Sequence, residues 1–431
     1  MPLQGSTKRR RGRATEAAAA DADALFSLPP EVLDDILNRV GIRDAVRTSL
    51  LSRVWRCRWE ELSSLDLSFR RHEDGEGTPE GLGAVDGVLL RCPGRVQRFC
   101  ADLDNTYAGR IHDWLRVLSR RGVEILDLSF GDGFPAPALP SSVFSCGRLS
   151  SLRLCGCSIP PLPPGFVAFP ELRRLILMNV RLHDYGEYQL EEIIGTSPLL
   201  HYLGLTDVLI GGARAKKWVI RAPNLRHLTI CSEINDGWIL KELTSLRSAL
   251  VRVSDFLVDH HFAKFLSGLA QVTELMVIND IRSSAMMPEK LLCTFHNLKI
   301  LKLFTHLCKQ SFIMLTLCLL KSAPNLEELK IQIFGPEEME FEANGEFLNA
   351  LWTDGMCANL KVVEMIGINW RRNEMSLIEL ILTKVRLLHT LWISQGDKLV
   401  MSNEDALYEL LRYRRASPEA QVLFKGYATG Y

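Results

Sequence analysis

Apolar residues recur in one short pattern from residue 123 onward. Each copy has an apolar residue, two others, a leucine, one other and another apolar residue. The central residues of the five clearest copies lie 26, 23, 28 and 25 positions apart, which predicts one strand in each unit of a repeat array. These copies are Val123-x-x-Leu126-x-Leu128, Leu149-x-x-Leu152-x-Leu154, Leu172-x-x-Leu175-x-Leu177, Leu200-x-x-Leu203-x-Leu205 and Leu225-x-x-Leu228-x-Ile230.

Later copies are less regular but keep the same apolar core. The wide gap after Leu228 leaves room for one degenerate unit near Leu246, and the long step after Leu329 implies an insertion around residues 335–344. The motif and its period are those of the leucine-rich repeat. We therefore expect an α/β solenoid with a curved parallel sheet and with irregular helices and loops outside. The later copies centre on Leu275, Leu301, Leu329, Val363 and Leu391.

Side chains of each predicted strand alternate between the interior and a concave face. The pattern sends Leu152 and Leu154 inward and leaves Arg153 on the concave face. Aromatic, methionine and charged residues on an exposed wall favour protein recognition. The alternative for each single residue is that loops or helices of the chain cover it. The candidate substrate-binding residues are Arg153, Arg174, Ile176, Met178, Tyr202, His227, Met276 and Phe304.

Residues 25–62 have the spacing of short amphipathic helices instead. Pro29 suits the start of a first helix, apolar residues then recur at steps of three and four, and Gly41 ends it. A second short helix is expected from Ala45 to Leu51, and a third carries Trp55 and Trp59. So short a module buries little surface alone, so we expect a partner to complete its apolar face. The alternative is that the face docks onto the rest of the chain.

The same segment carries a specific series of residues: Leu28-Pro29-x-Glu31-x-Leu33-x-x-Ile36-Leu37, then Arg43-Asp44-Ala45-Val46-Arg47-Thr48-Ser49-Leu50-Leu51-Ser52-Arg53-x-Trp55-Arg56. This series resembles the plant F-box motif, although Gly41 stands where that family usually has proline and Val54 where it usually has a basic residue. In that family the segment binds the Skp-type adaptor of a cullin-based ubiquitin ligase. The resemblance implies this role for Leu28, Pro29, Ile36, Leu37, Leu51 and Trp55.

Two later parts of the chain extend the resemblance. Ala222-Pro223-Asn224-Leu225 and Ala323-Pro324-Asn325-Leu326 are similar to phrases of plant F-box proteins with leucine-rich repeats. Residues 359–393 resemble the FBD region of the same proteins and predict a strand, an amphipathic helix and a strand. We favour a cap on the end of the solenoid over a separate binding site, with a last helix at about Asn403 to Arg415.

Composition narrows the classes of function. The 51 basic and 51 acidic residues balance, which argues against wrapping nucleic acid or lying on an anionic membrane. The apolar stretch 312–320 is too short to span a bilayer. The eleven cysteines are scattered, and Cys155-Gly156-Cys157 fits a repeat turn better than a metal or redox pair. We expect reduced thiols and neither metal nor cofactor, and we find no catalytic motif.

These patterns predict four parts: a disordered tail at residues 1–20, an F-box at 21–62, irregular repeats at 63–355 and an FBD-like cap at 356–431. The resemblance implies a non-catalytic subunit of an SCF-type (Skp–cullin–F-box) ubiquitin ligase that carries an unidentified protein substrate. A repeat scaffold without ligase function and a small-molecule-dependent co-receptor remain open. We expect the chain in the nucleus, the cytoplasm or both, with residues 8–13 as a candidate nuclear signal.

Overall fold

The computed structural model describes residues 29–39, 64–69, 85–91, 94–104, 107–131, 136–211, 218–232, 238–253, 259–279, 291–334, 341–343 and 345–425. The chain divides into two compact units, Met1–Leu152 and Arg153–Tyr431. Each unit is built around parallel strands with helices between them, as the repeat pattern predicted.

The first unit has three successive parallel strands, in the order β1, β2, β3. Helix α5 is held against this unit by Trp114, whose ring lies 6.2 Å from that of Phe99 and whose Nε1 donates a 2.6 Å hydrogen bond to Asp86 of α4. The elements are α2 (Pro30–Arg39), β1 (Ser64–Phe69), α4 (Val85–Arg91), β2 (Arg95–Leu103), α5 (Ala108–Arg120), β3 (Ile125–Phe130) and a 3₁₀ turn (Ser141–Ser145).

The second unit begins within β4 and holds the longer run of repeats. All the strand pairs in its principal sheet from β6 onward are parallel, and strands neighbour one another in chain order. The strands are β4 (Ser151–Cys155), β6 (Arg174–Met178), β8 (Tyr202–Thr206), β11 (His227–Ser232), β13 (Ser248–Val253), β14 (Glu274–Asn279), β15 (Ile300–Thr305), β16 (Glu328–Ile333), β17 (Val362–Ile368), β18 (Thr390–Gln395) and β19 (Gln421–Lys425).

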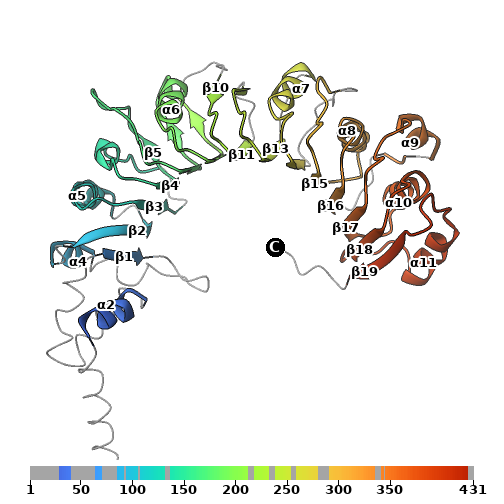
Figure 1. The fold of residues 1–431 in the computed structure, drawn as a ribbon, viewed down its shortest axis with the longest axis horizontal. Coiled ribbons are helices and arrows are strands. Elements are labelled where there is room, and N and C mark those ends of the chain that lie inside the picture. Colours follow the sequence, from blue (N-terminus) through green and yellow to red (C-terminus); the bar gives the residue numbers. More distant parts are fainter. Residues whose placement is uncertain are drawn as a thin grey trace, which may run out of the picture. The chain divides into compact units, whose positions relative to one another are not determined.

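Helices of the second unit lie on one side of this sheet, the outer side in Figure 1. Short strands form two smaller sheets, β5-β7-β9 and β10-β12. The elements are α6 (Gly186–Gly195), α7 (Asp259–Ser267), α8 (Gln310–Lys321), α9 (Gly345–Leu351), α10 (Arg372–Lys384), α11 (Asn403–Arg412), β5 (Ser158–Ile159), β7 (Arg181–Leu182), β9 (Leu209–Ile210), β10 (Trp218–Arg221) and β12 (Trp238–Lys241).

The core of the second unit is a column of side chains at the second position of each strand. Leu175, Leu203, Leu275, Leu301 and Leu391 are each at most 1% exposed. The degenerate repeat is a full strand, β13, which places the smaller Ala249 in this column. Full burial of one leucine side chain contributes roughly 2 kcal/mol, so the column holds neighbouring repeats together.

A regular backbone pattern joins the repeats at the start of the strands. The carbonyl of the residue before one strand accepts N–H groups from the equivalent residue and the first strand residue of the next repeat. Lys299 O, for example, accepts from Glu327 N and Glu328 N, both at 2.9 Å. This pattern satisfies backbone groups that would otherwise be unpaired where each turn ends.

The C-terminal prediction is confirmed as a strand, a helix and a strand, namely β17, α10 and β18. Strand β19, which the sequence analysis did not predict, continues the sheet beyond them. The apolar stretch 312–320 lies in α8, where Phe312 and Leu315 are fully buried. No helix among the residues that the structure describes is long and apolar enough to cross a membrane.

Glu374 is a buried carboxylate at the start of α10. Its side chain is 2% exposed, and its Oε2 accepts hydrogen bonds from the backbone N–H groups of Asn369 at 2.8 Å and Arg371 at 3.1 Å. Desolvation by burial outweighs these favourable bonds and raises the pKa of Glu374 from 4.5 to about 7. The folded chain therefore retains a proton here that the unfolded chain releases.

This raised pKa predicts a pH dependence of stability. Between pH 4.5 and about 7 the folded state binds the extra proton, so the free energy of unfolding falls as the pH rises through this window. The loss from this one group is on the order of 3 kcal/mol. Glu374→Gln keeps an oxygen acceptor without the charge. We expect it to unfold at a higher urea concentration than the wild type at pH 8 and at a similar one at pH 4.5.

Candidate functional site: two protein-recognition surfaces

Helix α2 carries the part of the predicted adaptor-docking surface that the structure describes. The Pro29 carbonyl accepts the N–H groups of Val32 at 3.0 Å and Leu33 at 3.2 Å, which starts the helix. Ile36 is 36% exposed and Val32 is 42% exposed, whereas Leu37 is only 2% exposed. The helix thus has a buried apolar side and a second apolar strip that faces outward.

The predicted docking residues therefore differ in position. Pro29 and Ile36 are accessible, while Leu37 packs inside the chain. Leu28, Leu51 and Trp55 lie outside the described residues, as do Gly41, Val54 and the two other predicted helices. The role of all these residues in adaptor contact stays a prediction.

The second surface is the strand face that alternates with the buried column. The eight candidate substrate-binding residues are all exposed or half-buried, each between buried neighbours on its strand or beside one, which confirms the predicted alternation. Arg153 contacts Met178 through Nη2 and Sδ, 3.6 Å apart. Met276 and Phe304 occupy other rows of the same face. The substrate-binding role of these residues stays a prediction.

Three of the candidates meet in one row across neighbouring strands. The Arg174 guanidinium lies 4.4 Å from the centre of the Tyr202 ring, a cation–π contact. The Tyr202 and His227 rings are 6.2 Å apart, and His227 Nδ1 lies 2.7 Å from Ser248 Oγ. The row offers planar groups on β6, β8 and β11 and the hydroxyl group of Ser248 on β13, which suits contact with another protein.

Charged residues farther along the face are paired across strands. Lys302 on β15 reaches Glu274 on β14 at 2.6 Å, while Glu364 on β17 binds Lys330 at 3.2 Å and Lys425 at 2.6 Å. Burial opposes ionisation of Glu364, but the hydrogen bonds from the two lysines prevail and lower its pKa. Both carboxylates and all three lysines are thus engaged in ion pairs within the chain.

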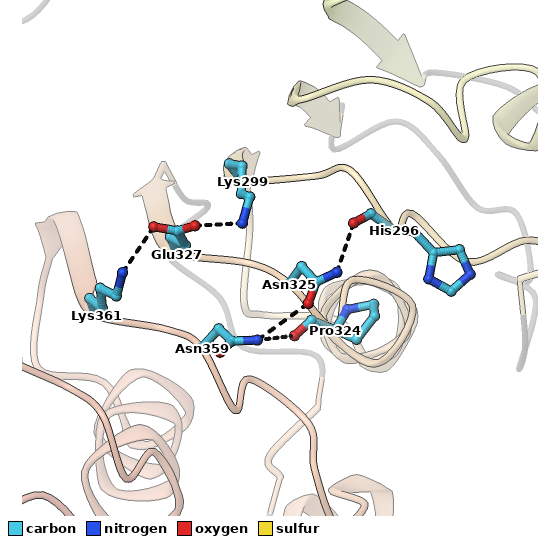
Figure 2. A network of polar contacts seen from close by, with 7 residues as sticks. All are labelled: His296, Lys299, Pro324, Asn325, Glu327, Asn359 and Lys361. Carbon is cyan, nitrogen blue, oxygen red and sulfur yellow. Dashed lines mark hydrogen bonds and ion pairs between the residues drawn. The ribbon is translucent and has the colours of Figure 1, made fainter.

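Charged residues at the strand edge of the same region are paired as well (Figure 2). Glu327 lies between Lys299 at 2.5 Å and Lys361 at 3.0 Å, and their hydrogen bonds lower its pKa. Below them, Asn325 Nδ2 donates to the His296 carbonyl at 2.9 Å and Asn359 Nδ2 to the Pro324 carbonyl at 3.2 Å. The asparagines link successive turns and act as structural residues.

Sequence reasoning missed three residues that stand at this edge in earlier repeats. Arg173, Arg226 and Arg247 each directly precede a strand and are exposed. Their signal was present as a leucine followed by an arginine in Leu172-Arg173, Leu225-Arg226 and Leu246-Arg247. These arginines were missed because the alternation of side chains is counted from the first residue of each strand, and they lie one residue before it.

The described residues contain no cluster of three or more histidine, cysteine or acidic side chains that could hold a metal ion. Burial raises the pKa of the thiols of Cys146, Cys157 and Cys357 to about 12, so each thiol stays protonated near neutral pH. Protonated, enclosed thiols are poor nucleophiles and poor metal ligands.

The repeated parallel strands and their backbone ladder define a leucine-rich-repeat protein. Comparison with known families agrees: the leucine-rich repeats of the FBD-associated F-box protein At5g56370 match residues 111–331, and the F-box domain matches residues 25–66. The chain belongs to this family of FBD-associated F-box proteins with leucine-rich repeats. F-box domains generally bind Skp-type adaptors, and proteins of this kind are generally non-catalytic.

Relatives from Arabidopsis thaliana share this organisation. The F-box/FBD/LRR-repeat protein At1g13570 is 29% identical over 93% of this chain and 98% of its own length. The F-box/FBD/LRR-repeat protein At1g13780 is 23% identical over 94% of this chain and 98% of its own length. F-box/LRR-repeat protein 13 is 28% identical over 57% of this chain and 54% of its own length.

Proposed function

We propose that the chain is the substrate-recognition subunit of an SCF-type ubiquitin ligase. The observation that carries the proposal is the F-box match over residues 25–66, joined in one chain to leucine-rich repeats. In this function the F-box docks a Skp-type adaptor and, through it, a cullin. The repeat face holds a protein substrate.

In this function the chain positions the substrate and does not itself make or break a covalent bond. A ligase subunit of this kind raises the effective concentration of substrate lysines near the ubiquitin-transferring enzyme. A repeat array suits this task because each unit packs on its neighbours and presents an extended face. The accessible strip with Val32 and Ile36 supports the docking half of the proposal, since exposed apolar groups gain from burial against a partner.

Co-purification with a Skp-type adaptor and a cullin tests the proposal. The wild-type chain is expected to retain both, and Leu28→Ala with Pro29→Ala is expected to weaken adaptor retention at least about tenfold. Ile36→Asp tests the exposed strip of α2. It should weaken adaptor retention similarly without lowering the thermal unfolding temperature. Leu90→Asp is the matched control, because Leu90 is 79% exposed but lies on α4, outside the F-box match.

Two results would contradict the proposal. A wild-type chain that never retains the adaptor under mild conditions would favour a repeat scaffold without ligase function. Retention that Ile36→Asp and Leu90→Asp reduce equally would mean that contact is not specific to the F-box helix. If the adaptor is retained as proposed, substrate candidates are the proteins that accumulate on a chain lacking residues 25–62 when the proteasome is inhibited.

A further inference from the structure

The residue directly before each strand forms a rim along the second unit. Backbone hydrogen bonds set this register: Arg173 O accepts from His201 N, His201 O from Arg226 N, and Arg226 O from Arg247 N. The rim therefore carries three arginines and one histidine on the successive strands β6, β8, β11 and β13. We call Arg173, Arg226 and Arg247 the arginine rim.

The arginine rim differs from the later rim in its pairing. Lys299 and Lys361 share Glu327, whereas no ion pair joins Arg173, Arg226 or Arg247 to any residue in the part of the chain that the structure describes. All three arginine side chains are exposed. A guanidinium presents several N–H donors in a fixed plane, which fits a carboxylate with two parallel hydrogen bonds. Three such forks are thus available to a partner.

The size of the arginine rim limits the length of an anionic partner. Neighbouring strands lie about 4.8 Å apart, so four strands span about 15 Å, close to five residues of extended peptide. Beyond these strands the rim continues with Thr273, Lys299, Glu327 and Lys361, and the adjoining first strand positions include Glu274 on β14 and Glu328 on β16. A long polyanion would pass Glu327 and run beside these two carboxylates, whereas a short acidic segment on the arginine rim would not.

The row beside the arginine rim adds a surface of planar side chains. Arg174, Tyr202 and His227 are the first strand residues on β6, β8 and β11, so they adjoin the rim positions. Their planar groups line the face next to the three guanidinium groups. Charge at the edge and aromatic surface beside it fit a peptide better than a bare phosphate backbone.

We propose that the arginine rim binds a short segment of the substrate protein that is rich in aspartate and glutamate. This inference rests on the proposed function, because it names the chemical class of the segment that the repeat arm recognises. Carboxylates of the segment pair with Arg173, Arg226 and Arg247, and its intervening side chains lie on the row of Arg174, Tyr202 and His227. Electrostatic attraction also speeds the encounter and makes the affinity fall with added salt.

Fluorescence anisotropy of the full-length chain tests the inference with defined probes. A labelled peptide with six consecutive glutamates is compared with its glutamine counterpart, with a phosphoserine peptide and with a short single-stranded DNA. The rim variant combines Arg173→Gln, Arg226→Gln and Arg247→Gln. The control combines Lys299→Gln, Lys330→Gln and Lys361→Gln, which removes the same amount of charge from lysines that already have acidic partners.

The expected result is that the glutamate peptide binds the wild type and the control with similar affinity and the rim variant about tenfold more weakly, since each exposed pair contributes modestly. Equal binding to the rim variant and the wild type would overturn the inference, and so would glutamine-peptide binding of the same strength. Tighter binding of the phosphoserine peptide or the DNA would overturn the choice of a carboxylate-rich segment.

Adaptor retention, measured on the same preparations, separates this inference from the proposed function. A chain that binds the glutamate peptide through the arginine rim but retains no adaptor would leave the recognition surface intact and remove the ligase role. A chain that retains the adaptor but shows no preference for the glutamate peptide would leave the ligase role intact and remove the arginine rim as the recognition surface. Circular dichroism of both triple variants checks that their folds are unchanged.

Discussion

Gly367→Ala is expected to lower the free energy of unfolding of the C-terminal repeats by about 4 kcal/mol. Gly367 has a φ of 80°, in the left-handed region that side chains disfavour, and it lies where the β17–β18 register shifts. A β-carbon at this position would overlap the Ile333 carbonyl oxygen at the end of β16. Since backbone atoms of the neighbouring strand cannot rotate away, the strands themselves would have to separate.

Gly355→Ala separates this overlap from the cost of the backbone conformation. Gly355 has nearly the same φ, 81°, but a β-carbon there meets nothing within 4 Å. We expect it to cost about 1 kcal/mol. Urea unfolding followed by tryptophan fluorescence gives the overall effect, and hydrogen exchange across residues 328–395 localises it. Equal losses for the two variants would show that contact with Ile333 does not determine the effect.

The sequence predicted the strands because one short motif specifies both the position and the facing of each side chain. Leu152 and Leu154 are buried and Arg153 is not, as period two requires. These features are local, so a single repeat contains all the information that they need.

Features that depend on pairing between repeats were not predicted. Glu274 and Lys302 are 28 residues apart, and their contact follows from the register of β14 on β15. The same holds for the row of Arg174, Tyr202 and His227, which the sequence supplied as separate candidates. Irregular repeat lengths hide this register, because each insertion outside the sheet changes the spacing without changing which strands meet.

Two adjacent apolar residues on α2 differ in their exposure to solvent. Ile36 and Leu37 are adjacent apolar residues in the F-box resemblance, yet only Ile36 is accessible. A helix turns about 100° per residue, so neighbours can face the interior and the solvent. Helical spacing alone identified an apolar strip but could not show which edge the rest of the chain covers. Substitution of Ile36 therefore tests docking more directly than substitution of Leu37.

Asn373→Ala is expected to destabilise the C-terminal repeats nearly as much as Gly367→Ala, by about 4 kcal/mol. Asn373 is 2% exposed on α10. Its Oδ1 accepts from Ala343 N at 2.7 Å, and its Nδ2 donates to the carbonyls of Leu307 at 2.6 Å and Phe341 at 2.8 Å. Alanine would leave three backbone groups without this partner, and each unsatisfied buried group costs about 1–3 kcal/mol.

Asn325→Ala is the matched control, because it removes an asparagine that donates one accessible hydrogen bond to the His296 carbonyl at 2.9 Å and accepts one from Asn359. Water can replace a bond at such a site, so we expect a loss of about 1 kcal/mol.

Asn373→Asp should be at least as harmful as Asn373→Ala, since it removes both donors and places a carboxylate near two carbonyl oxygens. Faster hydrogen exchange in residues 341–343 and α10 would locate the effect. Similar stability of the Asn373→Ala and Asn325→Ala variants would mean that the segment around Phe341 is held by its apolar contacts instead.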